Sequence, residues 1–136
     1  MITEYVEKIM RNGINNFSQE LNKSAQEVQI LIYWDAEEEK PKYKKLVQGE
    51  KSEVVTFNQI LNVRFDMMNR EAICGNFITG TLQKYSKEFS CEMSELFVVI
   101  YLTETNGNED EKDVHLFLYK NSQPMKEIEL EEILNI

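Results

Sequence analysis

Apolar side chains recur at helical spacing in two long stretches of the chain. Polar residues occupy the other side of the first stretch, residues 2–21, so the pattern predicts an amphipathic helix. Its apolar positions are Ile2, Tyr5, Val6, Ile9, Met10, Ile14, Phe17 and Leu21. Gly13 weakens the middle of this helix, and the sequence offers no reason for it. A second helix is predicted from about residue 66 to residue 89; Gly75 and Gly80 inside it are positions where it can kink or admit another backbone.

Runs rich in β-branched and aromatic residues follow each predicted helix. The runs that we interpret as strands are residues 28–35, 43–48, 53–57, 95–103, 114–120 and 126–130. An acidic loop, 36–40, precedes Pro41 between the first two strands. A polar loop, 104–112, contains Asn106-Gly107-Asn108 and is expected to be a hairpin connection and the least ordered segment.

The two halves of the chain repeat one pattern. An offset of 68 residues places the apolar positions of the first helix on those of the second, and Val28–Trp34 on Leu96–Leu102. Further along, the offset becomes 73, and Ile60–Asn62 then matches Ile133–Asn135. We interpret the chain as a single domain, residues 1–136, built from pseudo-repeats 1–62 and 69–136. The predicted fold is α+β: an internally duplicated α-β-β-β unit forming one antiparallel sheet, with the two long helices packed on one face.

The strands predict two apolar faces, although helices on one side cover only one of them. One face is aliphatic, with Val28, Ile30, Ile32, Trp34, Leu96, Val98, Ile100 and Leu102. The opposite face, which we call the aromatic face, consists of Leu31, Tyr33, Phe97, Val99, Tyr101, His115, Phe117 and Tyr119. If the helices cover the aliphatic face, the aromatic face meets a partner or is covered by the chain that crosses between the two halves. Its residues are therefore the candidate partner-binding residues, because an exposed apolar patch usually serves association.

Composition limits the classes of partner. Apolar residues make up 42% of the chain and charged residues 29%, which is typical of a globular domain. The net charge of −9 disfavours nucleic acid as a partner, since phosphate binding needs clustered cations. The longest apolar run, Leu96–Leu102, is too short to cross a membrane. The amino-terminal pattern lacks the basic and apolar segments of a signal peptide, so a cytoplasmic protein is expected.

Few residues offer chemistry. His115 is the only histidine, and no carboxylate is fixed near it by spacing, so it is expected in ordinary packing or at a surface. Cys74 is expected to be a buried apolar residue, and neither Cys74 nor Cys91 has the local signature of a nucleophile. Acidic clusters at 37–39, 109–111 and 127–132 are expected to be solvated, and we predict no catalytic residue, metal or cofactor. The basic stretch of Lys40, Lys42, Lys44 and Lys45 is interpreted as protection of an edge strand.

No residue motif identifies a family. The element order, size and acidity resemble the small secretion chaperones of bacterial type III systems and some small bacterial immunity proteins, although those chaperones usually end in a substantial helix that the pattern after Leu130 does not predict. We expect a non-enzymatic protein-interaction protein of chaperone, immunity or inhibitor type, which engages a protein partner or itself as a homodimer through the aromatic face. The alternatives are a small-molecule-binding module with a pocket between sheet and helices, and an enzyme with an unrecognised site.

Overall fold

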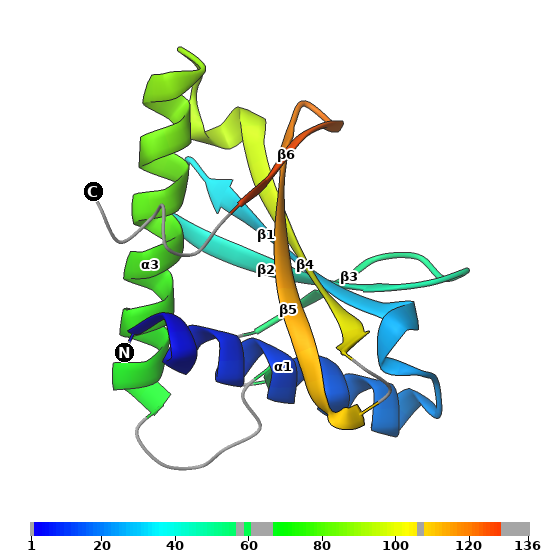
Figure 1. Ribbon diagram of the computed structural model, residues 1–136. Helices are drawn as coiled ribbons and strands as arrows, with labels where there is room; N and C mark the ends of the chain where they lie inside the picture. Colours follow the sequence, from blue (N-terminus) through cyan, green and yellow to red (C-terminus); the bar gives the residue numbers. More distant parts are fainter. Residues whose placement is uncertain (1, 57–58, 61–66, 106–107, 129–136) are drawn as a thin grey trace.

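The computed structural model describes residues 2–56, 59–60, 67–105 and 108–128. Two long helices, α1 (Ile2–Leu21) and α3 (Met67–Glu88), form where the helical spacing predicts them (Figure 1). Helix α1 ends as expected: Asn22, the next residue, has a φ of 55°, a left-handed conformation typical of the residue after a helix. Neither helix has the combination of length and apolar character that crossing a bilayer requires, within the residues described.

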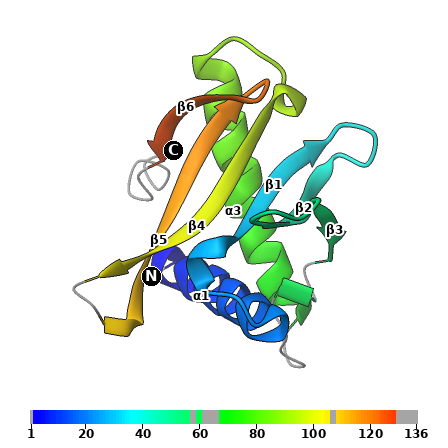
Figure 2. The ribbon, with the colours of Figure 1, turned by 90° about the vertical axis from the view of Figure 1, so that its right-hand side faces the viewer.

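Six strands form one antiparallel sheet in the order β3-β2-β1-β4-β5-β6. Figure 2 looks onto this sheet with α3 behind the strands. The strands are β1 (Val28–Asp35), β2 (Lys40–Val47), β3 (Glu53–Val55), β4 (Leu96–Thr105), β5 (Asn108–Lys120) and β6 (Gln123–Ile128). Short 3-10 turns, η1 (Ala25–Glu27) and η2 (Met93–Glu95), lead into β1 and β4. The predicted α+β fold with one antiparallel sheet and two helices is therefore confirmed.

One hydrophobic core cluster contains residues of α1, of α3 and of the aliphatic face of the sheet. Helix residues such as Met10, Ile14 and Ile78 are fully buried in the same cluster as the aliphatic side chains of β1, β4 and β5. On the core side of the sheet, one lysine contacts an aromatic ring of each helix. Nζ of Lys45 lies 5.1 Å from the ring centre of Phe17 in α1, and Nζ of Lys126 lies 5.3 Å from that of Tyr85 in α3.

Several predicted boundaries are wrong. Strand β2 starts at Lys40, so the acidic loop is shorter than expected and Pro41 pairs with Trp34 inside the ladder. The segment 104–112 was expected to be a loop, but β4 continues to Thr105 and β5 begins at Asn108. An antiparallel ladder joins backbone groups whatever the polarity of the side chains, so a polar hairpin arm has no alternating signature. Residues 106–107 lie outside the described residues.

The pairing registers of the two hairpins match one another. Leu31 in β1 faces Lys44 in β2, and Val99 in β4 faces Phe117 in β5; these pairs correspond at the offsets of 68 and 73 residues found in the sequence. The central ladder pairs Leu31 with Val99, which are equivalent at the offset of 68. The residue pairs of the β1–β2 hairpin therefore correspond, position for position, to those of the β4–β5 hairpin on the other side of the line between β1 and β4.

The glycines inside the helices have different surroundings. A Cβ atom built on Gly13 would lie 2.6 Å from Cγ2 of Ile60 and 2.9 Å from its backbone oxygen, so α1 admits this segment only because residue 13 is glycine. A Cβ on Gly75 or Gly80 would meet nothing within 4 Å. The close approach therefore occurs at Gly13, which the pattern of the sequence left unexplained, and at neither glycine of α3.

Candidate functional site

The residues of the aromatic face lie together on the side of the sheet opposite the core. The register brings Tyr33, Phe97 and Tyr119 into one row across three strands, because Tyr33 pairs with Phe97 and Phe97 with Tyr119. Leu31, Val99 and Phe117 form the next row, and Tyr101 pairs with His115 beyond it. All are half-buried except Val99, which is only 6% exposed and lies in the centre. None of them belongs to the hydrophobic core cluster of the described residues.

Rings on this face stack across neighbouring strands. Phe97 and Tyr119 are nearly parallel, with centroids 5.0 Å apart and 8° between their planes. Tyr101 and His115 stack at 5.1 Å and 16°, and the ring of Phe117 is tilted against Tyr119 at 5.5 Å. Stacked rings of this kind fix one another in place, so the face is a preformed apolar surface whose side chains need little ordering on binding.

His115 is held by two polar side chains that sequence reasoning missed. Its Nε2 lies 2.8 Å from Oγ1 of Thr103 in β4, and its Nδ1 lies 2.5 Å from Oε1 of Glu127 in β6. The carboxylate that the spacing could not supply comes from a strand that the register places beside β5, since Glu127 pairs with Phe117. The burial of Tyr101 beside this network raises the pKa of its phenol, and the nearby charge of Glu127 acts in the same direction.

This Thr–His–Glu arrangement has the order of a nucleophile, a base and an orienting acid. Acyl transfer also needs a cavity in which a substrate carbonyl reaches the hydroxyl and an oxyanion donor. Three surface cavities are lined by other residues. The first is lined by residues 26, 27, 29 and 46–48 at η1, β1 and β2, the second by residues 86, 87, 90–92 and 95 at the end of α3 and at η2, and the third by residues 40–43 and 54–56 at β2 and β3. None of these three contains Thr103, His115 or Glu127, and none joins α1 or α3 to a strand as the small-molecule alternative requires.

The lysines expected to protect an edge strand are divided between the two faces. Strand β2 is covered by β3 at residues 43–45, so it is not an edge strand there. Lys44 lies on the aromatic face with its Nζ 5.2 Å from the ring centre of Tyr33. Lys45 lies on the core face, where it forms an ion pair with Glu53 at 3.2 Å. The edge-protection interpretation is therefore wrong for these two lysines.

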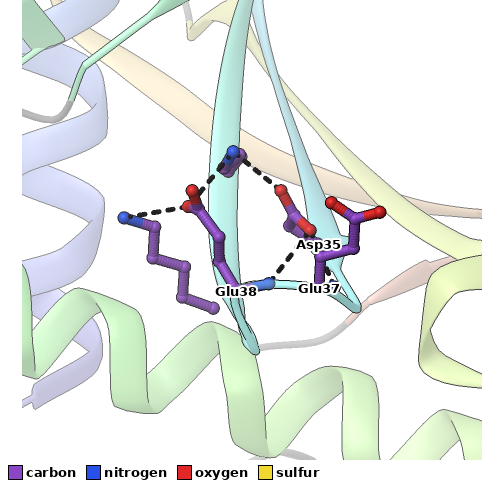
Figure 3. Close-up of polar contacts among 5 residues, drawn as sticks. Asp35, Glu37 and Glu38 are labelled. Atoms are coloured by element: carbon purple, nitrogen blue, oxygen red, sulfur yellow. Dashed lines mark hydrogen bonds and ion pairs between the residues drawn. The ribbon is translucent and has the colours of Figure 1, made fainter.

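The acidic residues of the first hairpin are paired within the hairpin. Oδ1 of Asp35 accepts the backbone N–H groups of Glu37 and Glu38, and Oδ2 lies 2.7 Å from Nζ of Lys42 (Figure 3). Glu38 contacts both Lys40 and Lys42 at 3.2 Å. The contact with Lys42 lowers the pKa of Asp35 and that of Glu38, and the two carboxylates raise the pKa of Lys42. Asp35 and Glu38 are therefore paired with groups of their own hairpin and do not form a cluster of unpaired carboxylates that would favour a cation.

The cysteines do not form a reactive pair with His115. Cys74 is fully buried in the core, on the far side of the sheet from the aromatic face, and burial raises the pKa of its thiol to about 12. Cys91 is a free thiol that packs against the rim of the core. Within the described residues, no group of three or more His, Cys, Asp or Glu side chains is arranged to hold a metal ion.

Comparison of the chain with family models, with curated proteins and with solved structures gave no match. The aromatic face is therefore the feature of this chain from which a function can be inferred.

Proposed function

We propose that this protein is a small non-enzymatic interaction protein that binds another protein surface through the aromatic face. One observation carries the proposal: the rings and aliphatic side chains of this face gather on one side of the sheet, partly exposed, and none of them belongs to the hydrophobic core cluster, which contains residues of both helices. Monomeric proteins rarely leave a continuous apolar surface in water unless it serves association. A chaperone, an immunity protein or an inhibitor would each use such a surface.

The character of the face favours a protein partner. Tyrosine and phenylalanine rings provide much of the binding free energy in protein interfaces, and a rim of polar groups normally surrounds them. Here the rim consists of Lys42 and Lys44 on β2 and of Glu127 on β6. The rings are already stacked, so binding would cost little side-chain entropy.

We also propose that the sheet arose by duplication of one α-β-β-β unit. The shared offsets of the two hairpin registers and the symmetric Leu31–Val99 pair support this origin. A duplicated unit explains why β1 and β4 each have an aliphatic side in the core, and why their opposite sides adjoin at the centre of the sheet.

Tyr33→Asp and Tyr101→Asp test the proposed function. We expect each variant to fold but to bind its partner, or itself, at least about 30-fold more weakly, because truncation of a central aromatic residue costs roughly 2 kcal/mol or more. The measurements are co-purification from the native host, light scattering at two concentrations, and thermal unfolding by circular dichroism. Gln83→Asp, at an exposed position of α3, is the matched control.

Two results would count against the proposal. If both tyrosine variants fold and associate like the wild type, the face has no role in association. If both fail to fold while Gln83→Asp folds, the tyrosines are required for stability and the interface assignment is wrong.

A further inference from the structure

The aromatic face carries opposite charges on its two sides. One register row crosses all six strands on this face, and its members in order are Val54, Lys44, Leu31, Val99, Phe117 and Glu127. Lys44 lies on the β2 side and Glu127 at the β6 end, where its side chain is 43% exposed. The middle of the row is apolar. The centre of the sheet, between Leu31 and Val99, separates the two charges.

We propose that the occupant of the aromatic face is the aromatic face of a second copy of this chain, related by a twofold axis parallel to the strands between β1 and β4. This inference rests on the proposed function and names its partner. A twofold interface requires a patch that is complementary to itself. The central row meets this requirement, because its cation and its anion lie on opposite sides of an apolar centre.

The rotation places the β2 side of one copy over the β5 side of the other. Lys44 then lies over the ring of Phe117 of the second copy, an arrangement that favours a cation. Glu127 of the second copy lies one strand further along, a lateral distance of about 4.8 Å, which a lysine side chain can span between sheets packed ~10 Å apart. The same contact forms twice, once from each copy.

The alternative twofold axis, which runs across the strands, is disfavoured by charge. It would lay β2 of one copy on β2 of the other and bring Lys44 against Lys44, and like charges in an interface oppose binding. The net charge of −9 opposes association only weakly at a distance, since screening at physiological ionic strength acts over about 8 Å. Lys42 is already paired with Asp35 and Glu38, so Lys44 is the cation placed to make the contact.

Charge reversal tests this arrangement. We expect Lys44→Glu alone and Glu127→Lys alone each to weaken self-association at least tenfold, because each homodimer would then contain two like-charge contacts. An equimolar mixture of the two variants should form a heterodimer with one native and one reversed pair, and the double variant should self-associate again. Lys87→Glu, at an exposed position of α3, should not change the dimer. Sedimentation velocity over a concentration series measures all of these states.

If Glu127→Lys does not fold because His115 loses its contact, Lys44→Gln and Lys44→Glu test the arrangement instead. The wild type should then self-associate most tightly, Lys44→Gln more weakly and Lys44→Glu most weakly. Equal affinities, or single variants that weaken the dimer without rescue in the mixture, overturn the arrangement. A wild type that stays monomeric at the highest concentration overturns the second copy as the occupant. In that case, loss of a co-purified partner in Tyr101→Asp would still support the proposed function, so the two failures are distinguishable.

Discussion

Single residues decide how closely the elements of this fold approach one another. Gly13 is the clearest case, because Ile60 fills the space in which any larger residue would place its Cβ atom. Ile60 is itself fully buried, so it has little room to move away. A Cβ atom added at Gly75 or Gly80 would lie in open space, so these two positions serve as controls for Gly13 within the same protein.

Gly13→Ala is expected to destabilise the protein although alanine favours helices. Alanine gains about 1 kcal/mol of helix propensity over glycine, but overpacking a buried site costs typically ~1–3 kcal/mol. Gly75→Ala and Gly80→Ala have no clash and should raise the free energy of unfolding by up to ~1 kcal/mol. Urea unfolding of the three variants measures the difference. Stabilisation by Gly13→Ala equal to that of the other two would show that Ile60 does not press on this position.

The two thiols should differ in reactivity because they differ in burial. Cys74 is inaccessible and its pKa is raised to about 12, whereas Cys91 lies at the rim of the core. We expect a thiol reagent to label one cysteine of the native protein rapidly and the second only after unfolding. The variant Cys91→Ser should remain unlabelled until denaturant is added. Rapid labelling of native Cys91→Ser would mean that the core around α3 opens readily.

At the scale of elements, side-chain periodicity located the segments that have a buried side, because the periodicity reflects burial. The ends of α1 and the whole of β1 fall where the pattern placed them. Pairing is a property of the backbone, so the polar arms of the β4–β5 hairpin left no trace in the pattern. The contact of Glu127 with His115 depends on the register between β5 and β6, which shifts at a bulge between Leu118 and Tyr119. The spacing of residues in the sequence does not predict this register.

The first hairpin should be sensitive to acid. Its contacts lower the pKa of Asp35 below the ordinary value of about 4, so the folded state favours the charged carboxylate. The stabilisation is therefore complete above that value and is lost as the pH falls through the lowered pKa. Asp35→Asn keeps the acceptor for the turn N–H groups but removes the ion pair with Lys42, and it should flatten the fall of stability below about pH 4.

The measurement for this hairpin is the urea midpoint as a function of pH, for Asp35→Asn and for the control Glu37→Gln. Glu37 contributes its backbone N–H to the turn, and its side chain is exposed. If the curves of the wild type and Asp35→Asn remain parallel down to pH 2–3, the contact with Lys42 does not stabilise the fold.

For the whole molecule, the α+β class and the grouping of the aromatic-face residues on one side of the sheet were predictable, because alternation along Leu96–Leu102 and His115–Tyr119 assigns each residue to a side. Alternation did not show which of the two sides faces the core. The strand order was not predictable from alternation alone. It decides which rings stack and which charges occupy the ends of a row, and these two features carry the interaction hypothesis.

The four-pair ladder between β1 and β4 is the seam that unites the two hairpins of the described sheet. Each hairpin draws on residues close together in the chain, whereas this seam requires the long segment between Tyr33 and Phe97 to close on itself. Closing a long segment costs entropy before its contacts repay it. We therefore expect each hairpin to form before the ladder between β1 and β4 joins them at the centre of the sheet.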